Sequence, residues 1–156
     1  MDELWMTQRP ELIALGRVGL AVLLGAAIGV EREVADKPAG LRTHMLVAGA
    51  AALMLSLGNF LVDHFSEGAS ASGLRLDPIR LIEAVVTGVA FLGAGTIIRD
   101  RNTGTAVRGL TTAASVLFTA VVGAAVSLSL YTLAVGATAV LLATLRLVGL
   151  LERRLL

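Results

Sequence analysis

The 37 residues between Arg108 and Arg146 include no charged side chain. As one helix they would extend about 55 Å at 1.5 Å per residue, whereas the hydrocarbon core of a bilayer is about 30 Å thick. The stretch is therefore predicted to form two membrane-spanning helices with a tight turn at Ser127–Ser129. Composition agrees, because hydrophobic residues make up 56% of the chain and the mean hydropathy is +0.82, well above a soluble domain.

The remaining apolar segments predict three more spans, at Leu12–Val30, Met45–Val62 and Leu81–Ile98. The fold class is therefore all-α: a polytopic membrane protein with five transmembrane helices, in which residues 1–156 form a single transmembrane domain. The N-terminal segment MDELWMTQRPEL is acidic and lacks a basic region, so no cleavable signal peptide is expected. Pro10 is expected in the first turn of the first helix.

The distribution of Lys and Arg predicts the orientation of these spans. Nine of them lie in the loops after the first and third spans and in the C-terminal tail, against three on the opposite side. Loops rich in Lys and Arg stay in the cytoplasm. The N-terminus is therefore predicted to lie outside and the C-terminus in the cytoplasm, with Asp63–Arg80 as an external loop.

Two similar hairpin ends face the predicted cytoplasmic side. In each, a glycine-containing apolar run ends in charges, a short polar segment follows, and the next apolar run begins near an arginine. The first end consists of Leu24–Glu33 (LGAAIGVERE) and Lys37–Val47 (KPAGLRTHMLV), and the second of Phe91–Asp100 (FLGAGTIIRD) and Val107–Ser115 (VRGLTTAAS). They are interpreted as a parallel two-hairpin internal repeat followed by a fifth helix, which implies a pseudo-two-fold axis along the membrane normal. The alternative is that small residues recur wherever membrane helices touch.

Charged and hydroxyl side chains at these two ends form the candidate functional cluster. Its members are Glu31, Arg32, Glu33, Arg42, Thr43, Asp100, Arg108 and Thr112. Carboxylates suit Mg²⁺, with Glu31 and Asp100 as candidate ligands, whereas the arginines would neutralise carboxylates or clamp an anion. Thr43 and Thr112 are expected to cap the helices that begin there. Glu31, Arg42, Asp100 and Arg108 are predicted to converge on one site; the alternative is a solvated, salt-bridged rim.

One histidine lies beside this cluster. His44 is a weak metal candidate, because the second histidine of the chain, His64, falls on the other side of the predicted membrane.

Two charged residues fall inside predicted spans, Arg17 and Glu83. A lone charge in the hydrocarbon costs several kcal/mol, about 3 on insertion scales, so the two are predicted to lie close together within one copy or across a homodimer. They are interpreted either as part of an ion path or as a static pair.

Four glycines stand near the ends of the first and third spans, Gly25, Gly29, Gly93 and Gly95. Gly25 and Gly29 are expected to let helices pack closely. Gly93 and Gly95 either do the same or open backbone carbonyls to an ion.

With these motifs together, the chain resembles the MgtC/SapB family of membrane proteins over about Gly16 to Leu151. The resemblance implies a bacterial inner-membrane protein linked to growth under magnesium limitation and, in the MgtC branch, to survival inside host cells and restraint of the ATP synthase. The chain departs from the family pattern at Ala90, Glu83 and Phe118, where glycine, glutamine and tryptophan are common. The chain is also expected to be a short, SapB-like form without the soluble C-terminal domain of that branch.

Several functional classes are excluded or disfavoured by the residue types. No nucleophile–base pair, phosphate loop or His-rich metal motif is present, so an enzyme is not expected. Six aromatic residues and no basic stripe argue against nucleic acid as a partner. No cofactor is expected apart from Mg²⁺, and the lipid bilayer is the expected environment. Two functions remain: a non-enzymatic regulator of another membrane complex in magnesium homeostasis, or a transporter or channel for Mg²⁺ or another ion.

Overall fold

A computed structural model describes the backbone of residues 2–66, 77–99 and 107–155, and the side chains of residues 9–62, 77, 79–97 and 107–149. Within these ranges the chain forms five helices and one pair of very short strands. In order they are α1 (Asp2–Val34), α2 (Leu41–Ser66), α3 (Pro78–Gly95), β1 (Ile98–Arg99), β2 (Val107–Arg108), α4 (Leu110–Ser127) and α5 (Tyr131–Leu155). The predicted all-α fold class is confirmed.

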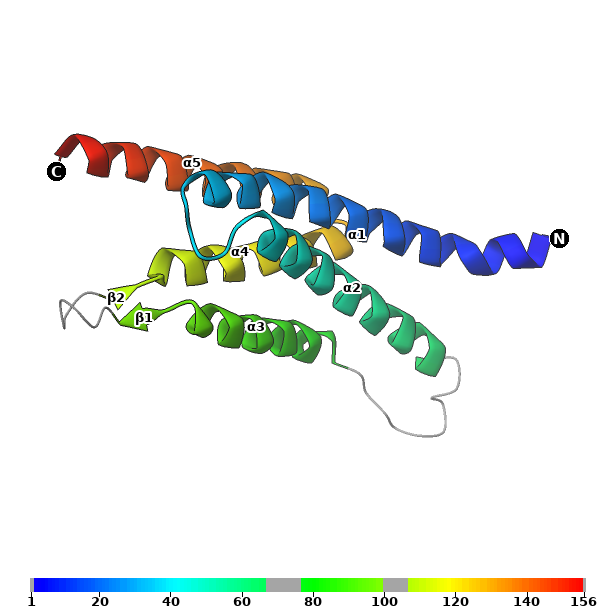
Figure 1. Cartoon of the computed structure of the whole chain (residues 1–156). Coiled ribbons are helices and arrows are strands. Elements are labelled where there is room, and N and C mark those ends of the chain that lie inside the picture. The colour runs from blue at the N-terminus through cyan, green and yellow to red at the C-terminus, as the bar shows by residue number, and fades with distance from the viewer. Residues whose placement is uncertain (1, 67–76, 100–106, 156) are drawn as a thin grey trace.

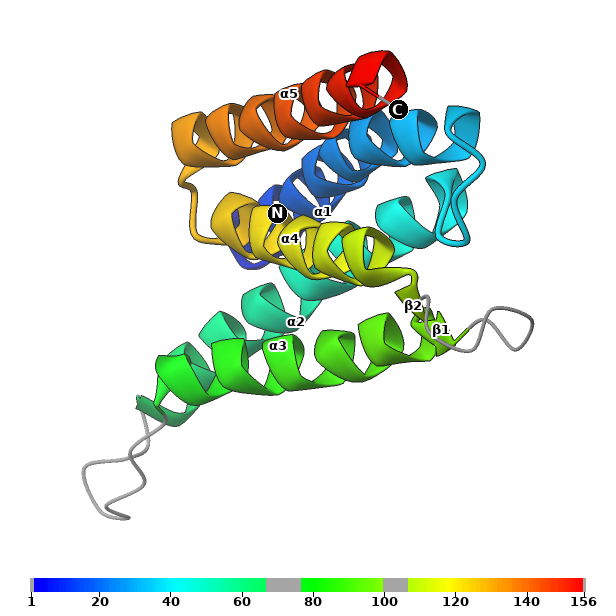
Figure 2. The ribbon, with the colours of Figure 1, turned by 90° about the vertical axis from the view of Figure 1, so that its left-hand side faces the viewer.

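Helix α4 lies at the centre of the bundle and contacts each of the other four helices. Helices α1 and α2 form an antiparallel hairpin, α3 packs on α4 and α2, and α5 packs on α4 and α1 (Figures 1 and 2). The α1–α2 turn, the β1–β2 pair and the C-terminal end of α5 lie at one end of the molecule, at the left of Figure 1, and the N-terminus and the end of α2 lie at the other. The two similar sequence motifs therefore occur at the same end of the bundle.

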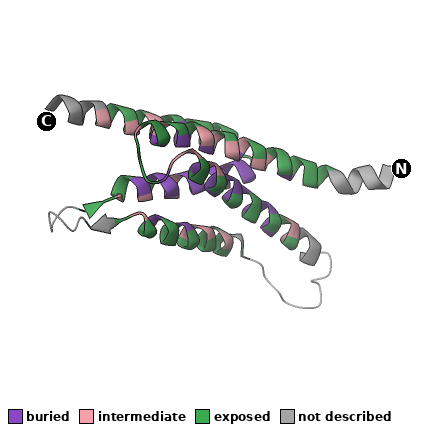
Figure 3. Ribbon diagram, viewed as in Figure 1, coloured by how far each residue is buried: buried purple, intermediate pink, exposed green. Residues whose placement is uncertain are grey.

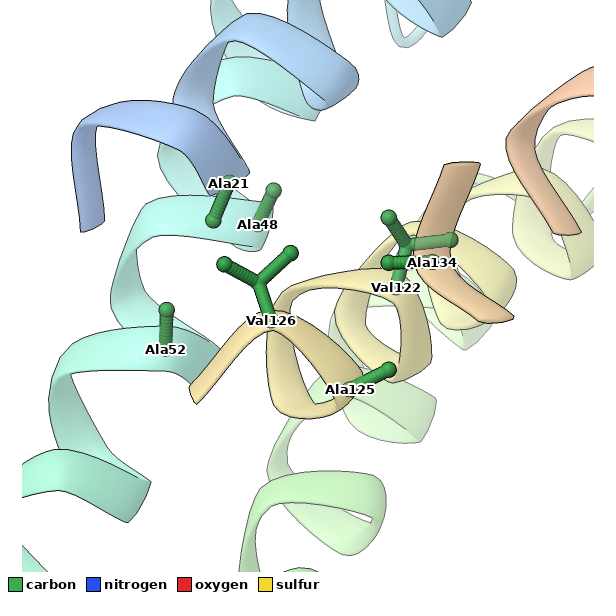
Figure 4. Close-up of a cluster of buried hydrophobic side chains, with 7 residues drawn as sticks. All are labelled: Ala21, Ala48, Ala52, Val122, Ala125, Val126 and Ala134. Carbon is green, nitrogen blue, oxygen red and sulfur yellow. The ribbon is translucent and has the colours of Figure 1, made fainter. Parts of the chain in front are cut away.

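Small side chains build the core between α1, α2, α4 and α5. Its fully or nearly buried members, drawn in Figure 4, are Ala21, Ala48, Ala52, Val122, Ala125, Val126 and Ala134. At Gly123 of α4 an added Cβ would lie 2.2 Å from the carbonyl oxygen of Ala48, so the two backbones approach as closely as small residues allow. This is the usual basis of helix association in lipid, where apolar burial gives little driving force.

Apolar side chains also cover the outside of the bundle. Burial concentrates on α4 and on the facing sides of α1 and α2, whereas α3 and α5 are largely exposed (Figure 3). Phe91 on α3 is 81% exposed and Leu46 on α2 is 72% exposed. A surface of this kind suits lipid rather than water.

Four helical segments are long and apolar enough to cross a membrane: Arg9–Val34, Leu41–Val62, Leu110–Ser127 and Tyr131–Gly149. The predicted turn is confirmed, since α4 ends at Ser127 and Ser129 adopts a positive φ of 62° before α5 begins. The fifth span stays a prediction. Helix α3 ends at Gly95, and Ile98, which the sequence placed inside that span, pairs instead with Arg108 in the β1–β2 pair.

The first helix begins earlier than the sequence indicated. Helix α1 begins at Asp2, so Pro10 lies inside the helix and the prediction that it occupies the first turn was wrong. Proline lacks the N–H that an interior helical residue donates and so favours a helix start, which is why the sequence reading placed it there.

Candidate functional site

The α1–α2 turn is closed by backbone hydrogen bonds. The amide of Lys37 donates to the carbonyl of Arg32 and the amide of Asp36 to that of Glu33, each at 3.0 Å. This is the bond pattern of a Schellman motif, with Asp36 in the left-handed conformation at φ 53°. Aspartate tolerates that conformation better than most side chains, so the sequence itself encodes a sharp stop for α1.

A carboxylate from α1 caps the start of α2. The amide of Leu41 donates to Oε2 of Glu33 at 2.9 Å, which satisfies one of the donors that a helix start leaves unpaired. Thr43 is the third residue of α2 and is exposed, so the prediction that Thr43 caps this helix was wrong. The helix begins two residues before it because Glu33 supplies the acceptor from across the turn.

Arg32 and Glu31 form an ion pair at the α1–α2 turn. The side chains are 4% and 10% exposed, and the guanidinium meets the carboxylate with two bonds, from Nε to Oε2 and from Nη2 to Oε1 at 2.8 Å. Both carboxylate oxygens of Glu31 therefore already accept from a cation. This geometry supports the neutralising role of arginine over a metal-ligand role for Glu31.

No group of three or more His, Asp or Glu side chains within the described ranges is placed to hold a metal ion. Asp100, the other metal candidate, lies outside these ranges.

His44 connects α2 to α4 in the interior. Its ring is fully buried, with Nδ1 2.9 Å from the carbonyl of Gly40 and Nε2 3.2 Å from the hydroxyl of Ser115. The Ser115 hydroxyl in turn lies 2.9 Å from the carbonyl of Thr112. Both ring nitrogens are thus engaged in the bundle, which argues against His44 as a metal ligand.

Glu31, Arg32, His44, Thr112 and Ser115 are called the interior cluster below. Glu31 and Arg32 lie near enough to His44 for their charges to act on it. Thr112 is buried as the third residue of α4, and the helix is preceded by Gly109, which offers no side-chain cap. The prediction that Thr112 caps α4 was therefore wrong.

The four residues predicted to converge are placed differently from one another. Glu31 bonds Arg32, whereas the Arg42 and Arg108 side chains are exposed and Asp100 lies outside the described ranges. The two hairpin ends share one end of the bundle, but the Glu31 side chain is largely buried and the Arg42 side chain is exposed. Convergence of all four stays a prediction.

The glycines divide into tight and loose positions. A Cβ on Gly25 would lie 2.5 Å from the His44 carbonyl oxygen, and one on Gly29 would lie 2.6 Å from the Leu41 Cα, so both allow α1 and α2 to touch. A Cβ on Gly93 would lie 3.4 Å from Ala113, an ordinary contact distance, and a Cβ on Gly95 would have no atom within 4 Å. The carbonyl of Gly93 accepts from both the amide and the hydroxyl of Thr96, which supports packing over an ion-binding carbonyl there.

At the opposite end, Arg17 donates from Nη1 to the carbonyl of Ser127 at 3.1 Å. The hydroxyls of Ser127 and Ser56 lie 3.0 Å apart beside it. Glu83 is exposed on α3, and its backbone carbonyl accepts from Thr87. Within one copy, the described residues thus contain no Arg17–Glu83 ion pair; their approach across a homodimer stays a prediction.

Sequence reasoning missed the inward direction of Arg32 and the roles of Ser115, Ser127 and Ser56. A helical period would have found them. Positions Ala21, Gly25, Ile28 and Arg32 lie on one face of α1, all buried, as spacings of three and four residues require. On α4 the buried positions Thr112, Ser115 and Thr119 follow the same period.

Comparison with known proteins matches most of the chain. A family model described as the MgtC family matches residues 18–154. The chain is 37% identical over 90% of its length to a protein named putative magnesium transporter YhiD of Escherichia coli K12, 34% over 74% to Protein SapB of Bacillus subtilis, and 38% over 78% to Protein MgtC of Salmonella typhimurium 14028s.

These relatives are longer proteins. The chain spans 62% of the YhiD protein, 47% of SapB and 46% of MgtC, that is, about half to three fifths of their length. No solved structure matches the chain.

Proposed function

Since the chain belongs to the MgtC family and is a multi-pass membrane protein, we propose that it supports magnesium homeostasis in the bacterial inner membrane. On this proposal it acts as a non-enzymatic regulator of another membrane complex. The relatives named for magnesium transport and for MgtC support the magnesium assignment. The N-terminus lies outside and the C-terminus in the cytoplasm, as the Lys and Arg distribution favours.

One observation favours a regulator over a channel. Among the described residues of one copy, the buried charged side chains and the side-chain hydrogen bonds between buried parts of different helices fall into two sets at opposite ends, the interior cluster and the set around Arg17 and Ser127. Along α1, Arg17 and Arg32 are about 22 Å apart at 1.5 Å per residue. Between the two sets lies the small-residue core, which includes Ala21, Ala48 and Val126.

Close packing of this core leaves no room for an ion. The Gly123 backbone lies against the Ala48 carbonyl, where even a methyl group would overlap at 2.2 Å. The hydroxyl of Thr119, which is buried near the midpoint, donates to the Ser115 carbonyl at 2.8 Å. A hydrated cation needs oxygen ligands or water along its whole path, and the described part of one copy offers neither.

A regulator needs an accessible surface, and the hairpin end supplies one. Glu33, Asp36, Lys37 and Arg42 are exposed around the α1–α2 turn, and Arg108 is exposed on the neighbouring β2. Mixed charges of this kind suit the charged segment of a partner protein. The ATP synthase, which the family resemblance implies, is the first complex to test.

A transporter is the second candidate, favoured by the name of the E. coli relative, putative magnesium transporter YhiD. Because the described part of one copy offers no path, we expect a route for Mg²⁺ to form between copies or with another subunit.

Liposomes that hold the purified protein and an entrapped Mg²⁺ indicator separate the two candidates. The regulator predicts the same Mg²⁺ entry as in protein-free liposomes, together with support of growth at low Mg²⁺ when the protein is expressed in a host lacking its own family member. Saturable Mg²⁺ entry in proportion to the amount of protein would overturn the regulator and establish the transporter.

Substitutions test the surface. Arg42→Ala and Arg108→Ala are expected to abolish growth support at unchanged membrane abundance. Arg80→Ala, an exposed arginine at the start of α3, removes the same charge from the opposite end and should have no effect. Full growth support by both hairpin-end variants would contradict a docking role for this surface.

A further inference from the structure

Arg17 opens onto a pocket that the function above does not use. The pocket lies between α1 and α2 at the N-terminal end, has a volume of about 410 Å³, and is lined by Pro10, Ile13, Ala14, Arg17, Ser56, Asn59, Phe60 and Val62. Its size lies within the range of small-molecule sites. Among the described residues, its polar lining is Arg17, Ser56 and Asn59, which includes one cation and no carboxylate.

The guanidinium of Arg17 has more donors than acceptors around it. It carries five N–H groups, and its direct bond goes to the neutral carbonyl of Ser127. Its Nε is enclosed and has no hydrogen-bond partner, and the Tyr131 side chain lies close enough to interact with the guanidinium. Glu83, the charge that the sequence suggested as its counterion, is exposed on α3, so in one copy the positive charge is not neutralised by a described residue.

The depth of Arg17 in the membrane makes an unneutralised charge costly. It is eight residues from the start of the apolar segment Arg9–Val34, about 12 Å along the axis at 1.5 Å per residue. Arginine at such a position extends toward the interface and binds phosphate with parallel N–H bonds. The amide of Asn59 and the hydroxyl of Ser56 add neutral polar groups beside it.

We infer that this pocket binds the phosphate of a phospholipid headgroup, with Arg17 as the cation that holds it and Asn59 as a second donor. The apolar part of the lining, which includes Ile13, Phe60 and Val62, suits the glycerol and upper acyl region of the lipid. That apolar portion and the depth within the bilayer favour a lipid over free phosphate, which shares the same anionic chemistry.

Native mass spectrometry of the full chain in detergent tests this inference. Titration with dioleoylphosphatidylglycerol should give one tightly bound lipid per chain, and dioleoylglycerol, which lacks the phosphate, should bind at least tenfold more weakly. Arg17→Gln should weaken phosphatidylglycerol binding by about 10- to 100-fold, because it removes charge-assisted bonds. Arg80→Gln, an exposed arginine at the same end of the molecule, is the matched control and should bind as the unmutated protein does.

A milder variant covers the case in which Arg17→Gln does not fold. Asn59 is exposed, so Asn59→Ala should leave the bundle intact while weakening lipid binding by about two- to tenfold, the loss of one hydrogen bond. The third arm measures the melting temperature with about 10 mM inorganic phosphate, a concentration high enough to detect millimolar binding of a free anion. Lipid, but not inorganic phosphate, should raise the melting temperature.

Three results would overturn the inference. The first is equal phosphatidylglycerol binding by the Arg17→Gln, Asn59→Ala and Arg80→Gln proteins. The second is equal stabilisation by inorganic phosphate and by lipid, which would assign the pocket to a free anion. The third is a dimer lost in both Arg17→Gln and Glu83→Gln without preference for the phosphate-bearing lipid, which would make a second copy the occupant.

Discussion

The two hairpin ends begin from similar sequences and close in different ways. After α1 the chain reverses within a few residues through a Schellman motif and the Glu33 carboxylate cap on α2. After α3 the chain forms the two-residue pairing of β1 with β2, and α4 then begins after Gly109 at φ 93°. The first end is closed by backbone hydrogen bonds together with a side-chain carboxylate, and the second by strand pairing and the backbone conformation of Gly109.

This difference shows that the same sequence motif has different structural roles at the two hairpin ends. Gly25 and Gly93 occupy the same place in the LGA motif, yet Gly25 lies against the backbone of α2, whereas at Gly93 an added Cβ would make only ordinary contact with Ala113. The first hairpin therefore depends on close helix contact and a buried ion pair. In the second hairpin, α3 packs on α4 with more room at the matched glycine.

The largest effect is expected from breaking the ion pair of the first end. Arg32→Met keeps much of the side-chain volume but leaves the Glu31 carboxylate, 10% exposed, without its cation. Breaking a buried pair costs about 3–5 kcal/mol of unfolding free energy. Unfolding in mixed micelles should show this loss, and Arg42→Met, which removes the same charge from an exposed position, should stay within about 0.5 kcal/mol. Similar stability of the two variants would show that the pair does not hold this end.

The matched glycines provide the second test. Gly25→Ala would place a Cβ 2.5 Å from the His44 carbonyl oxygen, so α1 and α2 must separate, at a cost of about 1–3 kcal/mol. Gly93→Ala meets atoms no closer than 3.4 Å and should be neutral or slightly stabilising, since alanine is the better helix former by up to about 1 kcal/mol. Melting temperatures in one detergent measure both. Equal destabilisation would mean that the two hairpins pack alike.

The last test distinguishes backbone from side-chain closure. Gly109→Ala forces a Cβ onto a residue at φ 93° and places it 2.0 Å from the Thr96 carbonyl oxygen, so it should cost about as much as Gly25→Ala, about 1–3 kcal/mol. Gly40→Ala meets the end of the Glu33 side chain, which can turn away, so its cost is that of the lost cap, about 1 kcal/mol. On this account Glu33→Ala and Gly40→Ala are not additive in unfolding free energy, whereas Glu33→Ala and Gly109→Ala are. Additivity of the first pair would remove the Glu33 cap from the explanation.

The sequence by itself determined the class of the protein and much of its layout. An uncharged stretch longer than one bilayer crossing requires a turn, and the small polar residues at Ser127–Ser129 placed that turn correctly. The charges bounded the apolar segments, because ionised groups are expensive in hydrocarbon. The motifs of the two hairpin ends identified the family, which the family model confirms.

Only the tertiary structure decided which of those charges turn inward. Arg32 and Arg42 are equally polar in the sequence, yet Arg32 is 4% exposed and Arg42 lies on the surface. A helical period fixes which residues share a face, but the neighbouring helices select the face that is covered. Arg17 likewise donates a hydrogen bond to the carbonyl of Ser127, 110 residues away, rather than pairing with Glu83 in the same copy. Backbone carbonyls at helix ends are acceptors that the residue types do not reveal.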